Sequence, residues 1–218
     1  MLDLLLPQRC VVCGLGGVQL CDGCLAGLPR IRPPLCERCG APTAWPVRRC
    51  RECAGRRIAF ATARAAVHYD DAVRAVVGAW KERALRRLAE TAAAITAEVV
   101  EGPAVRVVTF VPADPDRGLR RGYHPPQKLA EGLAAGWALP VDALLRRRGP
   151  AKRQRGLSRV ERRRNVAGAF VATDHVPGAV VLVDDVYTSG ATANAAASAL
   201  RKGGARRVQV VTFARVVR

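Results

Sequence analysis

The order of hydrophobic and polar positions predicts a chain in which strands and helices alternate. Apolar runs typical of buried strands cover residues 58–69, 104–112, 141–145, 179–185 and 206–216. Between these runs, apolar residues recur at helical spacing over 72–100, 127–136 and 193–202. Strands that are apolar almost throughout, and that alternate with helices, indicate a parallel sheet covered by helices on both faces.

The first quarter of the chain departs from this pattern and holds all eight cysteines. They form four C-x2-C pairs, Cys10/Cys13, Cys21/Cys24, Cys36/Cys39 and Cys50/Cys53. In a reducing compartment such pairs favour metal binding over disulfides. Two pairs supply four thiolates to one Zn²⁺, which leaves no open position and makes the ion structural. Pairing in chain order gives two Zn²⁺ sites, although the sequence leaves crossed pairings open.

The change in composition predicts two domains. Residues 1–57 form a cysteine-rich zinc-binding module, and residues 58–218 form the sheet domain. The module has few apolar residues, so metal binding must supply much of its folding free energy. The start, MLDLLL, has an acid at Asp3 and an apolar run too short to cross a bilayer. We therefore expect a cytoplasmic protein with no membrane insertion.

The charge of the chain is high and unevenly distributed. The formal net charge is +18, and residues 146–164 carry ten Lys or Arg against one Glu. A block of this density favours a polyanionic partner or a phosphorylated ligand. For the arginines scattered elsewhere, the amino-acid usage of a GC-rich genome is an equally good explanation.

The stretch VVLVDDVYTSGAT, Val180–Thr192, carries the sharpest chemical signal. An apolar strand ends at two carboxylates, Asp184 and Asp185, and a loop of small residues then leads into a helix. That loop consists of Thr188, Ser189, Gly190, Ala191 and Thr192. Backbone N–H groups at a helix start, together with hydroxyls, suit a phosphate monoester, whereas carboxylates suit ribose hydroxyls or Mg²⁺. The stretch therefore predicts a site for a sugar 5′-phosphate, and it lacks the GxxxxGK[ST] pattern of a Walker loop.

This stretch resembles the phosphoribosyl-pyrophosphate (PRPP) motif of type I phosphoribosyltransferases. With the cysteine pairs, the whole chain is similar to the ComF/ComFC family of competence-associated proteins. The likeness extends over MLDLLLPQRCVVCG, HYDDAVRAVVGAWK, RRGYHPPQKLA and QRGLSRVERRRNVAGAF. It implies a type I phosphoribosyltransferase-like parallel sheet with helices on both faces, beside a small N-terminal double zinc-ribbon module.

The resemblance also implies roles for single residues. Asp184 and Asp185 would bind the ribose or the Mg²⁺ of PRPP, and residues 188–192 would hold the 5′-phosphate. Further candidate contacts to phosphate or nucleic acid are Lys81, Arg121, Arg162, Arg163 and Arg164. For Lys81, a solvated helix residue is a nearly equal alternative. The chain departs from the family at His124 and Pro125, in place of Asn-Gln, and at 151–153, where only Gln154 remains of Thr-x-Pro-Gln.

Two functions from different classes follow from these features. The first is a module that binds PRPP or a related phosphoribosyl ligand and acts in DNA uptake, with single-stranded DNA and competence-machinery proteins as partners. The second is an active phosphoribosyltransferase that transfers phosphoribose from PRPP to an acceptor. For the second, the sequence identifies no general base, since none of the three histidines has a recognisable partner. A third reading, a sensor of PRPP, has no feature of its own.

Overall fold

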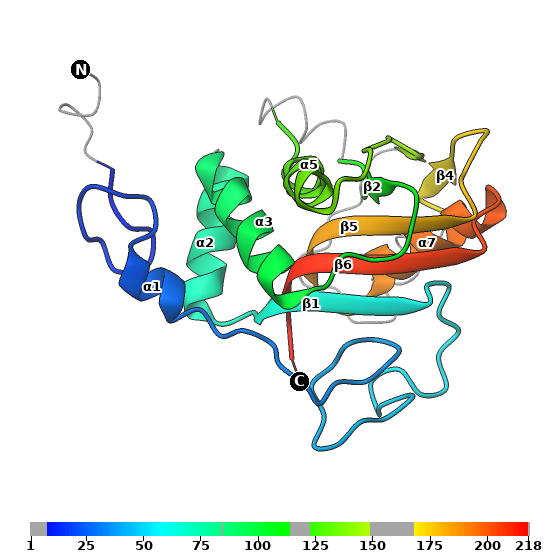
Figure 1. The fold of residues 1–218 in the computed structure, drawn as a ribbon, viewed down its shortest axis with the longest axis horizontal. Helices are drawn as coiled ribbons and strands as arrows, with labels where there is room; N and C mark the ends of the chain where they lie inside the picture. Colours follow the sequence, from blue (N-terminus) through cyan, green and yellow to red (C-terminus); the bar gives the residue numbers. More distant parts are fainter. Residues whose placement is uncertain (1–7, 84, 114–122, 149–167, 218) are drawn as a thin grey trace.

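A central parallel sheet organises the molecule (Figure 1). The computed structural model describes residues 8–83, 85–113, 123–148 and 168–217. Four strands pair in the order β1, β6, β5 and β2, and all three pairings are parallel. Their bounds are β1 (Thr62–His68), β6 (Arg207–Arg215), β5 (Ala179–Tyr187) and β2 (Val108–Phe110). The parallel sheet predicted from the apolar runs is therefore present.

Helices cover both faces of this sheet, as predicted. One face carries α2 (Asp71–Glu82), α3 (Arg87–Val99) and α5 (Pro125–Trp137), and the other carries α7 (Ala191–Lys202). Alternation along β5 serves both layers, because successive side chains of a strand point to opposite faces. Val181 and Val183 pack with the first group of helices, whereas Val180 and Leu182 pack with α7.

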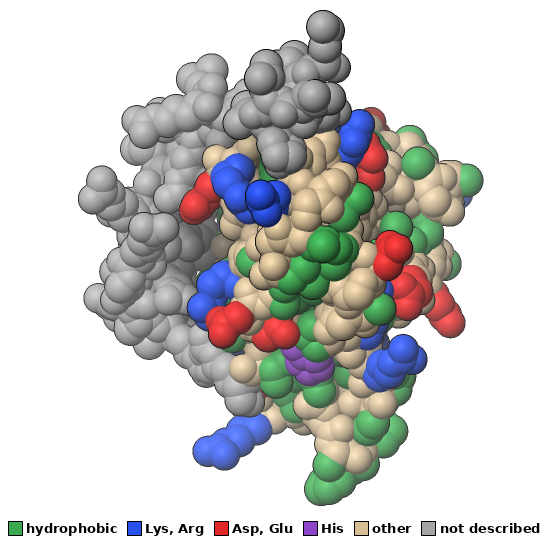
Figure 2. Space-filling view, turned by 90° about the vertical axis from the view of Figure 1, so that its left-hand side faces the viewer, with side chains coloured by type: hydrophobic (Ala, Val, Ile, Leu, Met, Phe, Trp, Pro, Cys, Tyr) green, Lys and Arg blue, Asp and Glu red, His purple; other side chains and the backbone are tan. Residues whose placement is uncertain are grey.

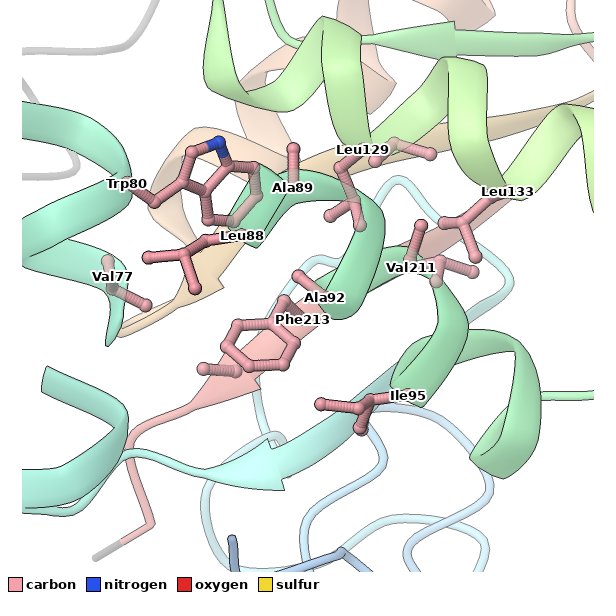
Figure 3. Close-up of a cluster of buried hydrophobic side chains, with 14 of the residues drawn as sticks. Val77, Trp80, Leu88, Ala89, Ala92, Ile95, Leu129, Leu133, Val211 and Phe213 are labelled. Atoms are coloured by element: carbon pink, nitrogen blue, oxygen red, sulfur yellow. The ribbon is translucent and has the colours of Figure 1, made fainter. Parts of the chain in front are cut away.

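The larger core lies between the sheet and the three helices on its first face (Figure 3). Trp80 of α2 is fully buried and meets Phe213 of β6 edge to face, with ring centroids 6.3 Å apart. Helices α3 and α5 approach so closely that a Cβ on Gly132 would lie 2.6 Å from the Cβ of Ala93. Close packing of this kind fixes the carboxyl ends of the strands, where the candidate ligand site lies.

Several boundaries differ from the sequence prediction. The helical stretch 72–100 is two helices, because α2 ends at Glu82 and α3 begins at Arg87. No Gly or Pro marks this break, and it allows both helices to pack against the sheet (Figure 1). Strand β2 is shorter than 104–112 and lies at the edge of the sheet, where β5 is the one named strand that pairs with it. Strand β5 is longer than predicted and runs to Tyr187.

A small hairpin was not predicted. In place of the strand expected at 141–145, the structure has β3 (Leu145–Arg147), which overlaps that range only at Leu145 and pairs antiparallel with β4 (Phe170–Ala172). The sequence signal at Val141 is nevertheless real, because Val141 bridges Val108 of the main sheet. Three-residue strands carry too little periodicity to be recognised without their partner.

The N-terminal module consists mainly of turns, and its two parts contact different regions of the molecule (Figure 1). Its first part, which includes α1 (Asp22–Ala26), lies beside α2, and its second part lies against β1 at the edge of the sheet. Gly40 has a φ of 67°, and a Cβ there would collide with the carbonyl oxygen of Ala63 in β1. Glycine is therefore required where the second part meets the sheet.

Candidate functional site

The eight cysteines form two clusters in chain order. Cys10, Cys13, Cys21 and Cys24 make the first zinc site, and Cys36, Cys39, Cys50 and Cys53 make the second zinc site. Within each cluster the sulfur atoms all lie within 4.8 Å of one another. Zn–S bonds of about 2.3 Å place the sulfurs of a tetrahedron about 3.8 Å apart. The separations of 3.7 Å for Cys13–Cys21, 3.6 Å for Cys36–Cys53 and 3.5 Å for Cys39–Cys50 fit this value.

Within the second zinc site the surroundings favour thiolate at Cys36, whereas burial raises the pKa of Cys39 and of Cys53. Burial raises the pKa of Cys36, but backbone N–H groups of Cys39, Cys50 and Arg38 outweigh this effect and lower the pKa to about 7. Thiolate is the form that binds metal. The cluster thus has the donors, the spacing and the hydrogen bonds that a four-thiolate Zn²⁺ site needs.

A tight loop joins β5 to α7 and forms the candidate ligand loop, residues 188–192. Gly190 caps α7 with a φ of 71°, in the left-handed region, and its carbonyl accepts the N–H of Asn194 at 2.9 Å. A Cβ at this position would also overlap the ring hydroxyl of Tyr187. Only glycine therefore meets both demands of the turn, which presents the N-terminus of α7 beside the end of β5.

The two carboxylates lie near the carboxyl end of strand β5 and have different surroundings. Asp185 forms an ion pair with Lys81 of α2, with Oδ2 and Nζ 2.6 Å apart. Asp184 lines a small hollow of about 10 Å³ with Thr188, Thr192 and Thr212. Consecutive strand residues point to opposite faces, which explains this division. The hollow has room for one water-sized group, such as a phosphate or ribose oxygen.

Electrostatics single out Asp184. Its withdrawal from water and the nearby charge of Asp185 raise the pKa of Asp184 to about 8, although Lys81 opposes the shift. The carboxylate oxygen accepts the backbone N–H of Asp185 at 2.9 Å. A carboxylate that is this poorly stabilised in its charged form gains most from a cation or from ribose hydroxyl donors.

Three residues next to the loop were not predicted as site residues. Arg56 donates to the carbonyl oxygen of Ser189 at 2.9 Å, and Arg215 lies over the ring of Tyr187 at 4.5 Å. Arg215 is only 1% exposed. A signal for it exists in the sequence, because an arginine in the apolar strand RVQVVTFAR needs a buried partner. Neither Arg56 nor Tyr187 carries a comparable signal.

A larger hollow, the α7 groove, lies on the other side of the helix start. It has a volume of about 520 Å³ and is bordered by residues 55–57, by Phe170 and by α7. Its lining includes three cations, Arg56, Arg57 and Lys202, and the polar side chains of Asn194 and Ser198. Among the described residues, none that lines the groove is acidic. The α7 groove therefore suits an anionic group that is larger than the hollow beside Asp184 can accept.

The remaining predicted contacts are divided between two outcomes. Lys81 lies at the site through its pair with Asp185. Arg121, Gln154, Arg162, Arg163 and Arg164 lie outside the described residues. His124 stands at the start of α5 and meets Phe110 edge to face at 5.5 Å, so it packs against β2.

The surface on the side of α1 and α2 shows no single sign of charge. Figure 2 shows Lys and Arg interspersed there with Asp and Glu, with hydrophobic side chains between them. Within the described ranges, no helix combines the length and the apolar character needed to cross a bilayer.

Comparisons with known proteins agree with these observations. Residues 1–54 match the double zinc ribbon domain family. Competence protein F of Haemophilus influenzae is 28% identical over 95% of this chain and 96% of its own length. DNA utilization protein YhgH of Salmonella typhimurium is 29% identical over 98% of this chain and 100% of its own length.

Among solved structures, glutamine phosphoribosylpyrophosphate amidotransferase from B. subtilis is 23% identical, with a TM-score of 0.39. That likeness covers 57% of this chain and 25% of the solved chain. The predicted parallel sheet with helices on both faces, beside a double zinc ribbon, is confirmed by the strand topology and the family match. The two four-cysteine clusters are structural Zn²⁺ sites.

Proposed function

We propose that this chain binds PRPP or a related ribose 5-phosphate ligand and handles single-stranded DNA in the cytoplasm during DNA uptake. Its similarity, along almost its whole length, to competence protein F and to DNA utilization protein YhgH supports this proposal. Competence-machinery proteins would be its protein partners. The observation that carries the ligand half of the proposal is the pairing of a poorly stabilised Asp184 with a hydroxyl-lined loop at a helix start.

The sugar phosphate would meet two kinds of group at this loop. Backbone N–H groups at the start of α7, with the hydroxyls of Thr188 and Thr192, would bind the 5′-phosphate. Asp184 would accept from ribose hydroxyls or bind Mg²⁺, because carboxylate oxygens are ligands that Mg²⁺ prefers. When bound, Mg²⁺ would neutralise pyrophosphate charge.

Lys81 gives the site a second cation close to the ligand. Its ammonium group pairs with Asp185, and its side chain is only 27% exposed. A bound phosphate would compete with Asp185 for this ammonium, which would free the Asp185 carboxylate for ribose or Mg²⁺. The two aspartates would then act on one ligand even though they have separate partners without it.

The α7 groove supports the DNA half of the proposal. Arg56, Arg57 and Lys202 border it, and its lining holds no acid within the part of the chain that the structure describes. Cations along a groove bind phosphates of a nucleic-acid backbone without regard to sequence. Since Ala191 lines both the α7 groove and the hollow beside Asp184, a strand in the groove would pass next to the bound sugar phosphate.

The ligand half is tested by isothermal titration of the zinc-loaded protein with PRPP and Mg²⁺. Replacing Asp184 and Asp185 together by Asn keeps their size and removes their charges. Each charge-assisted hydrogen bond contributes roughly 1.5–3 kcal/mol, so we expect binding to weaken about a hundredfold or more. The matched control is Asp174→Asn, an exposed carboxylate in the loop before β5, which should bind as the parent does.

The same instrument tests the DNA half with an oligothymidylate. Binding should weaken steeply with salt, because each phosphate contact releases a counterion. A parent protein that binds neither PRPP nor the oligonucleotide would refute the proposal. Release of pyrophosphate from PRPP, measured with candidate acceptors, would then separate a binding module from a phosphoribosyltransferase.

A further inference from the structure

We propose that the second zinc site is a working part of the ligand site, because Arg215 and Arg56 tie it to residues 187–190. Zinc bound to the second site would hold the ligand loop in its binding conformation. The statement about the ligand rests on the proposed function. The tie between zinc and loop rests on contacts within the chain alone.

Arg215 makes the first connection. Its guanidinium group donates to the carbonyl oxygen of the zinc ligand Cys39 at 2.6 Å, and to Glu52 Oε2 at 2.7 Å. The same group lies 4.5 Å from the ring centre of Tyr187. One buried side chain therefore spans from the second zinc site to the end of β5. An arginine buried this completely keeps its place only while its acceptors keep theirs.

Tyr187 passes this connection on to the ligand loop. Its ring is buried, held edge to face by Phe60 at 6.4 Å on one side and covered by Arg215 on another. Its hydroxyl lies so close to Gly190 that no Cβ fits between them. A displacement of the ring would therefore move the turn that presents the start of α7.

Arg56 makes the second connection, by a separate route. It follows the last zinc ligand, Cys53, by three residues and donates to the carbonyl oxygens of Glu52 at 3.2 Å and Ser189 at 2.9 Å. Nearby, the N–H of Ala59 donates to Asn194 Oδ1 at 2.7 Å. The segment that leaves the second zinc site is thus bound both to the ligand loop and to the first turn of α7.

The first zinc site has no such connection among the described residues. Its neighbouring arginine, Arg30, donates to the carbonyl oxygen of Leu25 at 2.6 Å and pairs with Glu98 of α3 at 3.5 Å. These contacts lead to the helices on the opposite face from α7. The first zinc site therefore serves as an internal control.

The physical consequence is linkage. Without zinc, four thiols no longer fix the loop 36–53, so Cys39, Glu52 and Arg56 lose the positions that their contacts require. Zinc at the second site should therefore raise the affinity of residues 188–192 for their ligand. Because coupling between two sites is reciprocal, the bound ligand must raise the zinc affinity of the second site by the same factor. Zinc at the first site should be unaffected.

The tie is tested without ligand by hydrogen–deuterium exchange of the full chain. Cys50→Ser empties the second site, and Cys13→Ser empties the first. Each hydrogen bond lost corresponds to a factor of roughly 2–10 in a local opening equilibrium. We expect peptides over 187–194 to exchange about 3–10 times faster in Cys50→Ser and at the parent rate in Cys13→Ser.

Three further variants, none of which changes a zinc ligand, keep the test decisive if Cys50→Ser does not fold. Arg56→Ala should retain two Zn²⁺ per chain by metal analysis and the parent Tm, yet exchange faster over 187–194. Arg56→Lys, which can still donate to Ser189, should restore part of the protection, and Arg30→Ala should leave these peptides unchanged. Parent exchange rates in Arg56→Ala, or faster exchange spread over the whole chain, would overturn the tie.

The effect of the ligand on zinc binding is measured in a separate experiment. PRPP with Mg²⁺ should slow the release of the second-site zinc to a chelator, and the first-site zinc should leave at its usual rate. If the parent binds PRPP and both zinc ions leave at unchanged rates, the linkage is wrong and the proposed function stands. If the parent binds no PRPP, the proposed function falls, and the exchange rates alone decide the tie.

Discussion

Each of the two zinc sites consists of four cysteines, but the surroundings of the two sites differ. In the first zinc site only Cys10 is buried, and Cys13 is exposed. In the second, Cys36, Cys39 and Cys53 are all buried. The first part of the module packs through Val11, Leu25 and neighbouring apolar residues against the helices of the larger core. The second part of the module is joined to the sheet by the buried Arg215 and by backbone hydrogen bonds.

This difference separates two uses of one metal motif. At the first zinc site, the ion stabilises a short segment that packs on the outer side of the helices of the larger core. At the second, the ion fixes groups that complete the sheet domain itself, since Arg215 of β6 has its main acceptors in the zinc loop. Identical ligand sets therefore need not have equal effects on stability or on function.

The largest expected effect compares Cys36→Ser with Cys13→Ser. Loss of the second ion leaves Arg215 and Glu52 without fixed partners inside the protein, so the free energy of unfolding of the whole chain should fall by about 4 kcal/mol or more. Loss of the first ion should lower it by about 1–2 kcal/mol. Urea unfolding followed by far-UV circular dichroism measures both. Equal losses would erase the distinction between the sites.

The sequence predicted those features that depend on local pattern. The C-x2-C pairs, helices α5 and α7 and the turn at Gly190 each have a signal within a few residues. The role of Arg215 does not, because Cys39 lies 176 residues away along the chain. The break between α2 and α3 likewise depends on packing rather than on a breaker residue. The domain boundary after residue 57 stays a prediction. Arg56, just before that boundary, donates a hydrogen bond to Ser189 on the other side of it.

The next effect isolates the buried arginine from the metal. Arg215→Met keeps the apolar stem, removes the guanidinium group and leaves the Glu52 carboxylate unpaired. We expect a loss of about 3–5 kcal/mol in the free energy of unfolding. Arg207→Met, at the exposed start of the same strand, should change it by less than about 0.5 kcal/mol. A small loss for Arg215→Met would place the stabilisation in the zinc ligands alone.

A smaller effect, of opposite sign, is expected at the end of β5 beside the second zinc site. The pKa of Asp184 is about 8 in the fold, against 3.8 as its ordinary value. Between these values the folded chain keeps a proton that the unfolded chain has released, so stability falls as pH rises from about 4 to 8. Asp184→Asn mimics the protonated form and removes this loss.

The variant should therefore be more stable than the parent at pH 8 by at least about 1 kcal/mol, which is the size of one pKa unit. The two proteins should converge near pH 4. Urea midpoints measured without Mg²⁺ across this range test the sign. Both zinc ions should remain bound in the variant. A parent that gains stability between pH 4 and 8 relative to Asp184→Asn would contradict the raised pKa.

The smallest effect extends the comparison to charge. The described part of the chain before Arg30 carries one basic residue, Arg9, whereas the segment after the second zinc site contributes Arg56 and Arg57 to the α7 groove. If a single strand follows this groove, each phosphate contact adds about 0.7 to the slope of log affinity against log salt. Arg57→Ala with Lys202→Ala should thus flatten the slope by about 1.4, as measured by the anisotropy of a labelled oligothymidylate.

The control is Arg9→Ala. This variant should leave the slope unchanged, because Arg9 lies on the side of the first zinc site. An equal decrease in the Arg9 variant would mean that DNA contacts both halves of the module, and the division of labour between the two zinc sites would then hold for stability only.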